Sequence, residues 1–207
     1  MAAVPDFNNK LNFPAFIGLP SDCELEDRYY SGSGGFPVRH WCFLAQIKES
    51  VPWVRPMFNI TDINGSKYLV AFHGDNRGRY PIIREKCKDG RTICIMYAFQ
   101  HRFFDGQIGV RVEDESYVKV LPCSLPELFS ISDAMARNHK ICNVCGNVAS
   151  LRCSKCGIFY CSKQCQFNDW KGVHKKQCKV VQQVVEWGAF DWNKFGGFKV
   201  FSEIRVE

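Results

Sequence analysis

Hydrophobic and polar residues alternate in short runs along the first half of the chain, a pattern typical of β-strands. In Trp41–Lys48, the residues Phe43, Ala45 and Ile47 fall on one face. The other strands that the pattern predicts are Met57–Ile63, Lys67–His73, Thr92–Phe99, Ile108–Val112 and Tyr117–Leu121. The dipeptide Asn64-Gly65 between the first two of these is a strong signal for a hairpin turn.

The period of the pattern changes at Arg79–Lys88, which predicts a short helix between the third and fourth strands. This order of elements resembles the OB-fold. Residues 60–65 (ITDING) and 68–72 (YLVAF) resemble the middle strands of its single-strand-DNA-binding members. The resemblance covers residues 36–125 and implies a small antiparallel β-barrel. Another small antiparallel barrel or a sandwich fits the same strands, so this alternative stays open.

Seven cysteines and one histidine recur at metal-ligand spacings further along the chain. These candidate ligands are Cys142, Cys145, Cys153, Cys156, Cys161, Cys165, His174 and Cys178. Zinc prefers four thiolate or imidazole ligands in a tetrahedron, and a C-x2-C turn brings two thiolates to one ion. Eight ligands suffice for two closed sites. A closed site has no open position for water or substrate, so the pattern indicates structural metal.

The spacing closely resembles that of the MYND zinc finger over residues 142–178, including Tyr160-Cys161-Ser162 and residues 165–170 (CQFNDW). The resemblance implies two Zn²⁺ ions and an interleaved pairing, which the spacing alone does not give. The first ion takes Cys142, Cys145, Cys161 and Cys165, and the second takes Cys153, Cys156, His174 and Cys178. The segment has too few apolar residues for an independent core, so metal binding must supply its folding free energy, on the order of 10 kcal/mol per site.

The sequence therefore predicts an α+β multidomain chain, with an N-terminal OB-like barrel and a C-terminal finger that a helix caps. The predicted boundaries are 1–35 for an N-terminal lead and flexible joint, 36–125 for the barrel, 126–139 for a linker, 140–180 for the finger and 181–207 for a helical and aromatic tail. The joint is the Gly/Ser run Ser31–Gly35. Lys163–Lys179 predicts a helix that the apolar residues of Val180–Trp187 extend. The aromatic residues that follow pack against the finger or the barrel, or form an exposed docking patch.

Positive charge gathers in the finger. The chain carries a net charge of +6, and residues 131–180 hold nine Lys or Arg residues against Asp133 and Asp169. Seven thiolates and two zinc ions would lower the net charge of this segment to about +4. A basic finger suits nucleic acid, but the same charge also balances the anionic zinc–thiolate centres.

The MYND resemblance implies a protein-interaction module, an adaptor that docks short proline-containing peptides of partner proteins. The residues that match the family's peptide contacts are Ser154, Gln166 and Trp170. Gln166 and Trp170 are four residues apart and share one helical face. An extended peptide that proline already restricts loses little entropy on binding. Trp170 fits a second role equally well, that of covering the second zinc site.

The OB resemblance implies the alternative function, single-stranded nucleic-acid binding by the barrel with the finger as an accessory. Such a barrel stacks bases on aromatic rings within a basic channel. The candidate aromatic residues are Phe58, Tyr68, Phe72, Tyr97, Phe99 and Phe103, and the candidate basic residues are Arg55, Lys67, Arg77, Arg79, Arg102 and Arg111. Acidic residues in the same region weaken this interpretation.

We expect no catalytic residues and no small-molecule substrate. Many MYND fingers interrupt SET-domain lysine methyltransferases, but only 29 residues follow Cys178, and no segment resembles the cofactor motifs of that domain. A role as an accessory of a methyltransferase complex is a further alternative. No apolar run approaches about 18 residues, so we expect no membrane partner. The remaining, scattered cysteines fit reduced thiols in a nuclear or cytoplasmic eukaryotic protein.

Overall fold

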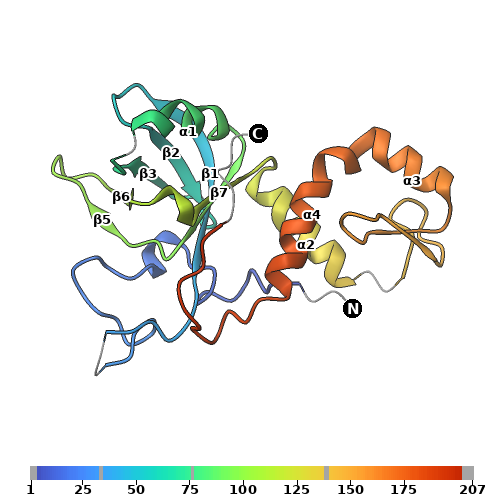
Figure 1. The fold of residues 1–207 in the computed structure, drawn as a ribbon, viewed down its shortest axis with the longest axis horizontal. Coiled ribbons are helices and arrows are strands. Elements are labelled where there is room, and N and C mark those ends of the chain that lie inside the picture. The colour runs from blue at the N-terminus through green and yellow to red at the C-terminus, as the bar shows by residue number, and fades with distance from the viewer. Residues whose placement is uncertain (1–3, 33–34, 76, 138–139, 202–207) are drawn as a thin grey trace. The chain divides into compact units, whose positions relative to one another are not determined.

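A computed structural model describes residues 4–32, 35–75, 77–137 and 140–201 (Figure 1). The chain divides into two compact units. The barrel unit comprises Phe7–Leu125 and Asp191–Glu207, and the finger unit comprises Met1–Asp6 and Pro126–Phe190. These units differ from the predicted boundaries, because most of the N-terminal lead and the aromatic part of the tail belong to the barrel.

The barrel unit contains one mixed sheet. Its strands are β1 (Cys42–Val51), β2 (Met57–Asp62), β3 (Lys67–Phe72), β4 (Thr92–Met96), β5 (His101–Arg102), β6 (Ile108–Val112) and β7 (Val118–Leu121). Helix α1 (Tyr80–Lys86) lies between β3 and β4 in the chain, as the sequence predicts. The described residues also include the short 3-10 helices η1 (Phe16–Gly18), η2 (Arg77–Arg79) and η3 (Glu115–Tyr117).

The order of the strands closes this sheet into a barrel. Within the described residues the order is β5-β6-β3-β2-β1-β4-β7, so β6 and β7 lie at or near opposite ends of the sheet. Only residues 113–117 join these two strands in the chain, and five residues span at most about 17 Å. The sheet must therefore curl so that these two strands approach each other. This is the OB-like topology that the sequence predicts, with one difference: β3 and β6 pair in parallel, whereas the prediction was an antiparallel barrel.

Two strands end more than one residue from the predicted bound. The fourth ends at Met96 and not at Phe99, because Tyr97 adopts a left-handed backbone conformation with φ of 55°. β1 continues to Val51 and contains a bulge between Ile47 and Glu49 in its pairing with β2. Its buried residues lie on both faces and not on one.

The predicted N-terminal lead packs as part of the barrel unit. The ring of Phe16 stacks on Tyr68, with 3.8 Å between centroids, and its backbone N–H donates to the buried carboxylate of Asp62 (3.1 Å). Asp62 also accepts hydrogen bonds from the N–H groups of Asn64 and Ser66 in the β2–β3 turn (3.0 Å each). One buried carboxylate therefore holds both the hairpin and the lead.

The predicted flexible joint at 31–35 is a loop whose two ends pair with each other through the backbone. Ser31 donates its backbone N–H to Phe36 (2.9 Å), and Tyr30 forms a β-bridge with Pro37. Residues 33 and 34 of this prediction lie outside the described residues.

The aromatic part of the tail packs on the barrel, so the structure decides between the alternatives that the sequence leaves open. Trp192 contacts Phe13, with 4.5 Å between ring centroids. The backbone N–H of Lys199 donates to the hydroxyl of Tyr97 (3.0 Å). Phe198 lies against the same tyrosine ring, with 5.1 Å between centroids.

A helix lies where the sequence predicts a linker. Helix α2 (Leu125–Arg137) covers most of 126–139, and residues 138 and 139 lie outside the described residues. Its buried residues Leu125, Leu128 and Ile131 recur at helical spacing, so the segment has an apolar face that a linker lacks. The side chain of Gln177 donates to Glu127 of α2 (2.8 Å), which joins α2 to the C-terminal helix α4 (Figure 1).

A helical run carries the last ligands. It consists of α3 (Lys163–Asp169), a π-helical turn, η4 (Trp170–His174), and α4 (Lys175–Gly188). The sequence predicts this helix and its extension past Lys179, but not the π turn. The strands β8 (Leu151–Arg152) and β9 (Phe159–Tyr160) form a small hairpin before it.

Candidate metal centres

The first C-x2-C turn is closed by its own backbone. Cys142 donates its N–H to the carbonyl of Asn147 (2.7 Å) and accepts from the N–H of Gly146 (3.0 Å). Gly146 has a φ of 74°, a conformation that favours glycine because it carries no Cβ. The turn brings the thiols of Cys142 and Cys145 to one side.

The second C-x2-C turn repeats this geometry. Cys153 donates to Ile158 (2.8 Å) and accepts from Gly157 (2.9 Å), whose φ is 81°. Cys156 is its second thiol. The same local sequence, two cysteines followed by a glycine, therefore produces the same turn twice.

The remaining four ligands come from the end of the hairpin and the helical run. Cys161 directly follows β9, and Cys165 lies in the first turn of α3. The hydroxyl of Ser162 caps this helix by accepting from the N–H of Cys165 (3.2 Å), which fixes the start of the helix beside Cys161. His174 ends the π turn, and Cys178 follows one turn later in α4.

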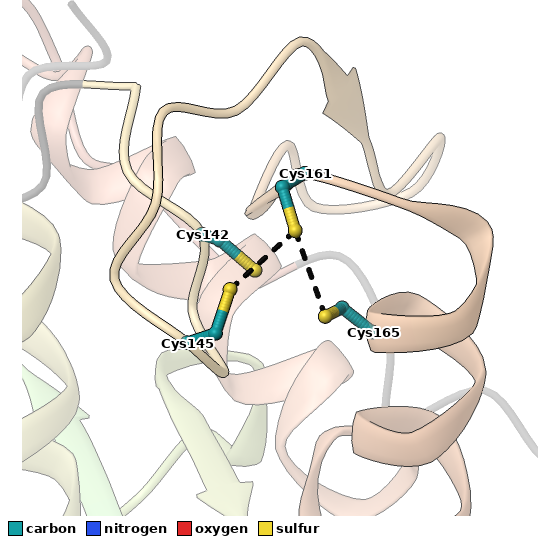
Figure 2. A group of neighbouring side chains, drawn as sticks. All are labelled: Cys142, Cys145, Cys161 and Cys165. Atoms are coloured by element: carbon teal, nitrogen blue, oxygen red, sulfur yellow. Dashed lines mark hydrogen bonds between the residues drawn. The ribbon is translucent and has the colours of Figure 1, made fainter.

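The structure brings these ligands together in two groups of four. Among the described residues, the first group is Cys142, Cys145, Cys161 and Cys165, and the second is Cys153, Cys156, His174 and Cys178. Within each group all ligand atoms lie within 4.8 Å of one another. This is the interleaved grouping that the resemblance to the MYND finger implies. Figure 2 shows the sulfur atoms of the first group converging on one point.

The distances within each group fit a tetrahedral zinc ion. Zn–S bonds of about 2.3 Å place two thiolates of a tetrahedron about 3.8 Å apart. The Cys161 sulfur lies 3.4 Å from Cys145 and 3.6 Å from Cys165. In the second group, the sulfurs of Cys153 and Cys178 are 4.0 Å apart. The Nε2 atom of His174 lies 3.4 Å from the sulfur of Cys156.

The two centres differ in exposure and share a support. All four ligands of the second group are buried, whereas Cys145 in the first group is exposed. The hydroxyl of the buried Tyr160 donates to the carboxylate of Asp169 (2.7 Å), which also accepts from the side chain of Asn143 (3.0 Å). Asp169 therefore ties the first turn, the hairpin and α3 together. Sequence reasoning missed this role.

One thiol in each centre ionises readily. Burial opposes ionisation of Cys142, but the backbone N–H groups of Cys145, Cys161 and Val144 outweigh it and lower the pKa to about 6. In the second centre burial likewise opposes ionisation of Cys153, and donors led by the ring of His174 lower its pKa to about 6. The first cysteine of each turn is thus prepared as a thiolate ligand.

Four protein ligands at each centre leave no position for a substrate, so the two zinc ions stabilise structure. The MYND finger family matches residues 142–178, the segment that contains all eight ligands. Residues 142–178 are a MYND finger. The MYND finger occupies a minor part of the chain, and the match says nothing of the barrel.

The similar curated proteins share the MYND region and little else. Ubiquitin carboxyl-terminal hydrolase 19 of Arabidopsis thaliana is 44% identical over 48 residues, which are 23% of this chain and 7% of that protein. Dauer abnormal formation protein 25 of Caenorhabditis elegans is 43% identical over 44 residues, 21% of this chain and 11% of that protein. This chain spans about a tenth or less of the length of these relatives.

Solved structures resemble the chain only weakly. Pot1pC of Schizosaccharomyces pombe bound to single-stranded DNA is 13% identical, with a TM-score of 0.33, over 52% of this chain and 96% of that chain. The Stn1–Ten1 complex of S. pombe is 12% identical, with a TM-score of 0.32, over 55% of this chain and 88% of that chain. The barrel assignment rests on the strand pairing itself.

The three predicted peptide contacts lie on the surface of the MYND finger. Ser154 is exposed in the second turn, Gln166 is half-buried, and the side chain of Trp170 is 37% exposed. Trp170 also lies against the ligand His174, with 5.8 Å between ring centroids, so the structure supports its covering role. Sequence reasoning missed Phe167, which is 52% exposed beside Trp170 on α3. The sequence signal was that Phe167 lies four residues from both Lys163 and Lys171 and so shares a helical face with these charged residues.

Half of the six aromatic residues predicted for nucleic-acid binding are buried in the barrel unit. Phe58, Phe72 and Tyr97 are buried, and Phe16 stacks on Tyr68. Phe99 and Phe103 are half-buried. Alternating strand residues point inward in a closed barrel, which explains why the sequence pattern could not separate core from surface.

Some of the predicted basic residues are engaged within the barrel unit. Arg79 forms an ion pair with Glu115 (2.9 Å), and Arg111 forms one with Glu113. Arg55 donates to the carbonyl of His73 (2.8 Å). The exposed members of the set are Lys67, Arg77, Arg102 and Arg111. No helix among the described residues is long and apolar enough to span a membrane.

Proposed function

We propose that the MYND finger is a protein-interaction module that binds proline-containing segments of partner proteins at Ser154, Gln166 and Trp170. The observation that carries the proposal is an aromatic surface on a scaffold held by closed metal sites. Phe167 of α3 and Trp170 of η4 are partly exposed on the helical run, and Trp170 lies against the zinc ligand His174. A rigid, partly exposed aromatic side chain is the usual anchor of a small interface.

The role we propose is binding and not catalysis. Each zinc centre has four protein ligands, so neither offers a position at which water or a substrate carbonyl would be activated. The metal instead fixes the backbone that presents Ser154 and α3. Peptide binding should therefore disappear together with the metal.

The experiment measures binding of a library of proline-containing peptides to the zinc-loaded chain and to the Trp170→Ala variant. We expect the variant to bind about 30-fold more weakly, since truncating an aromatic anchor costs about 2 kcal/mol. The matched control is Trp53→Ala, which removes a more exposed tryptophan from the barrel unit (65% exposed) and should leave affinity unchanged.

Native mass spectrometry must find two zinc ions in each variant, because Trp170 contacts His174 and its loss could disturb the second centre. Gln166→Ala, which leaves that contact intact, serves as a second variant. Equal affinity in the wild-type chain, Trp170→Ala and Gln166→Ala would refute the peptide surface. So would a library in which no peptide binds the wild-type chain.

The alternative, binding of single-stranded nucleic acid by the barrel, has less support. Bases stack on free ring faces. Three of the predicted rings are buried, and Tyr68 has Phe16 on its face. The barrel hypothesis predicts an affinity for a single-stranded oligonucleotide that falls steeply with salt and survives deletion of residues 140–207.

A further inference from the structure

The basic side chains of the MYND finger form no ion pair among the described residues. Residues 140–180 carry eight basic side chains and one acidic residue, Asp169. The basic residues are Lys140, Arg152, Lys155, Lys163, Lys171, Lys175, Lys176 and Lys179, all exposed. Asp169 is already engaged by Tyr160 and Asn143. Within the described part of the chain, the ion pairs found lie in the barrel unit and involve none of these eight residues.

The basic residues also do not serve the zinc ligands directly. Among the described residues, the sulfur atoms have hydrogen-bond partners in each other, in His174, in Ser162 and in Gln182, but not in a lysine ammonium group. With both ions bound, the finger still has a net charge of about +4. This charge is therefore available to a partner.

Two of the lysines flank the aromatic surface. Lys163, Phe167 and Lys171 follow one another at intervals of four along the helical run and so share a row. The ammonium group of Lys171 lies 4.3 Å from the centroid of the Phe167 ring. Trp170 lies beside this row. The positive charges of Lys163 and Lys171 therefore flank the apolar surface that Phe167 and Trp170 form.

This arrangement suits carboxylates beside an apolar side chain better than nucleic acid. Base stacking needs a free ring face. Lys171 covers one face of Phe167, and Trp170 lies against His174. Both rings therefore offer less free surface for base stacking than an unobstructed ring, and the part that stays exposed suits an apolar side chain of a peptide.

We propose that the partner segment of the MYND finger carries Asp or Glu residues next to its apolar anchor, and that these carboxylates pair with Lys163 and Lys171. The inference rests on the proposed function and adds the charge that selects the partner. Each exposed ion pair contributes up to about fivefold in affinity. Two such ion pairs together should raise the affinity of a peptide with an acidic flank about tenfold at low salt.

The test compares three versions of one proline-containing peptide, with acidic, neutral (Asn and Gln) and basic flanks. Each is titrated into the full, zinc-loaded chain at low and high salt. We expect the acidic peptide to bind about tenfold more tightly than the neutral one at low salt, and the difference to shrink at high salt. A single-stranded oligonucleotide is tested as a competitor.

Charge reversal locates the pairing. Lys163→Glu with Lys171→Glu should abolish the preference for the acidic flank and favour the basic one. The matched control is Lys176→Glu with Lys179→Glu, which makes the same change in net charge on α4 and should retain the preference. Glutamate at position 163 lies in the first turn of a helix, where negative charge is favourable, so the variant should fold. Native mass spectrometry that finds two zinc ions in the variant verifies that it folds.

Each result bears on one proposal or the other. Equal binding of acidic and neutral peptides overturns the charge preference and leaves the peptide surface standing. An equal loss of this preference in the two double variants also overturns the proposal, because it would reflect general electrostatic attraction and not pairing with Lys163 and Lys171. If the oligonucleotide displaces the acidic peptide at equal concentration, nucleic acid is the favoured partner of this surface, and the proposed preference for acidic peptides is overturned. If no peptide binds, whatever its flank, the proposed function itself fails.

Discussion

Removing zinc should unfold residues 142–178 and leave the barrel unit folded. The perturbation is a chelator, added until native mass spectrometry records no bound zinc. Both metal centres lie in the finger unit, and the strands of the barrel pair without them. The two parts of the chain should therefore respond differently to one treatment.

The magnitude follows from what is buried in the finger. Apart from the ligands, the buried apolar side chains of residues 142–178 are Ala149 and Tyr160. Fully burying one large apolar side chain contributes about 1.5–3 kcal/mol. A structural zinc site contributes about 10–16 kcal/mol. The metal term is several times larger, so the finger cannot stay folded without it.

Hydrogen exchange read by mass spectrometry is the assay. Backbone amides of 142–178 should lose protection after chelation, whereas those of β1 and β4 should keep theirs. Zinc should restore the protection and Mg²⁺, which prefers oxygen ligands, should not. Unchanged protection of 142–178 after both ions are gone would refute the reasoning that metal, and not packing, holds this segment.

Two further predictions concern the ligands. Ser162→Ala should destabilise the finger by about 1 kcal/mol, because it removes the cap that accepts from the N–H of Cys165; denaturant unfolding of the zinc-loaded chain measures this. Zinc retention against a chelator, corrected for the chelator's own protonation, should fall as the pH is lowered from 8 to 6. Zinc binds the thiolate form of cysteine, and an ordinary cysteine thiol has a pKa of about 8.5, so protons compete increasingly with zinc for the cysteine ligands as the pH falls.

Each of these has its own check. The control for the cap is Ser162→Thr, which keeps a hydroxyl that accepts the same hydrogen bond; an alanine variant as stable as the wild-type chain contradicts the capping role. For the pH dependence, equal zinc retention at pH 8 and pH 6 would show that proton competition at the thiols is unimportant.

Local spacing predicted the metal centres because each turn depends on a few adjacent residues. Cys142 and Cys153 each begin a turn that a glycine closes, and this geometry needs no information from elsewhere in the chain. The assignment of ligands to ions is different. It depends on where the hairpin and the helical run lie in space, so only the family resemblance and then the structure could supply it.

The segments that sequence reasoning got wrong depend on distant contacts. The lead became part of the barrel unit because Phe16 stacks on Tyr68 and donates to Asp62, 46 residues away. The predicted linker is the helix α2, whose apolar face is short and easily mistaken for a loop. The strand pattern predicted the barrel, since alternation reports burial directly, but it could not identify the parallel pairing of β3 with β6.

The interleaved grouping has a consequence for how the finger acquires its metal. The first ion closes the chain from Cys142 to Cys165, and the second closes it from Cys153 to Cys178, so each loop encloses two ligands of the other. Whichever ion arrives first shortens the search that the remaining ligands must make. Loading should consequently be all-or-none, with few molecules holding a single ion, and a cell short of zinc would contain complete and empty fingers and hardly any half-filled ones.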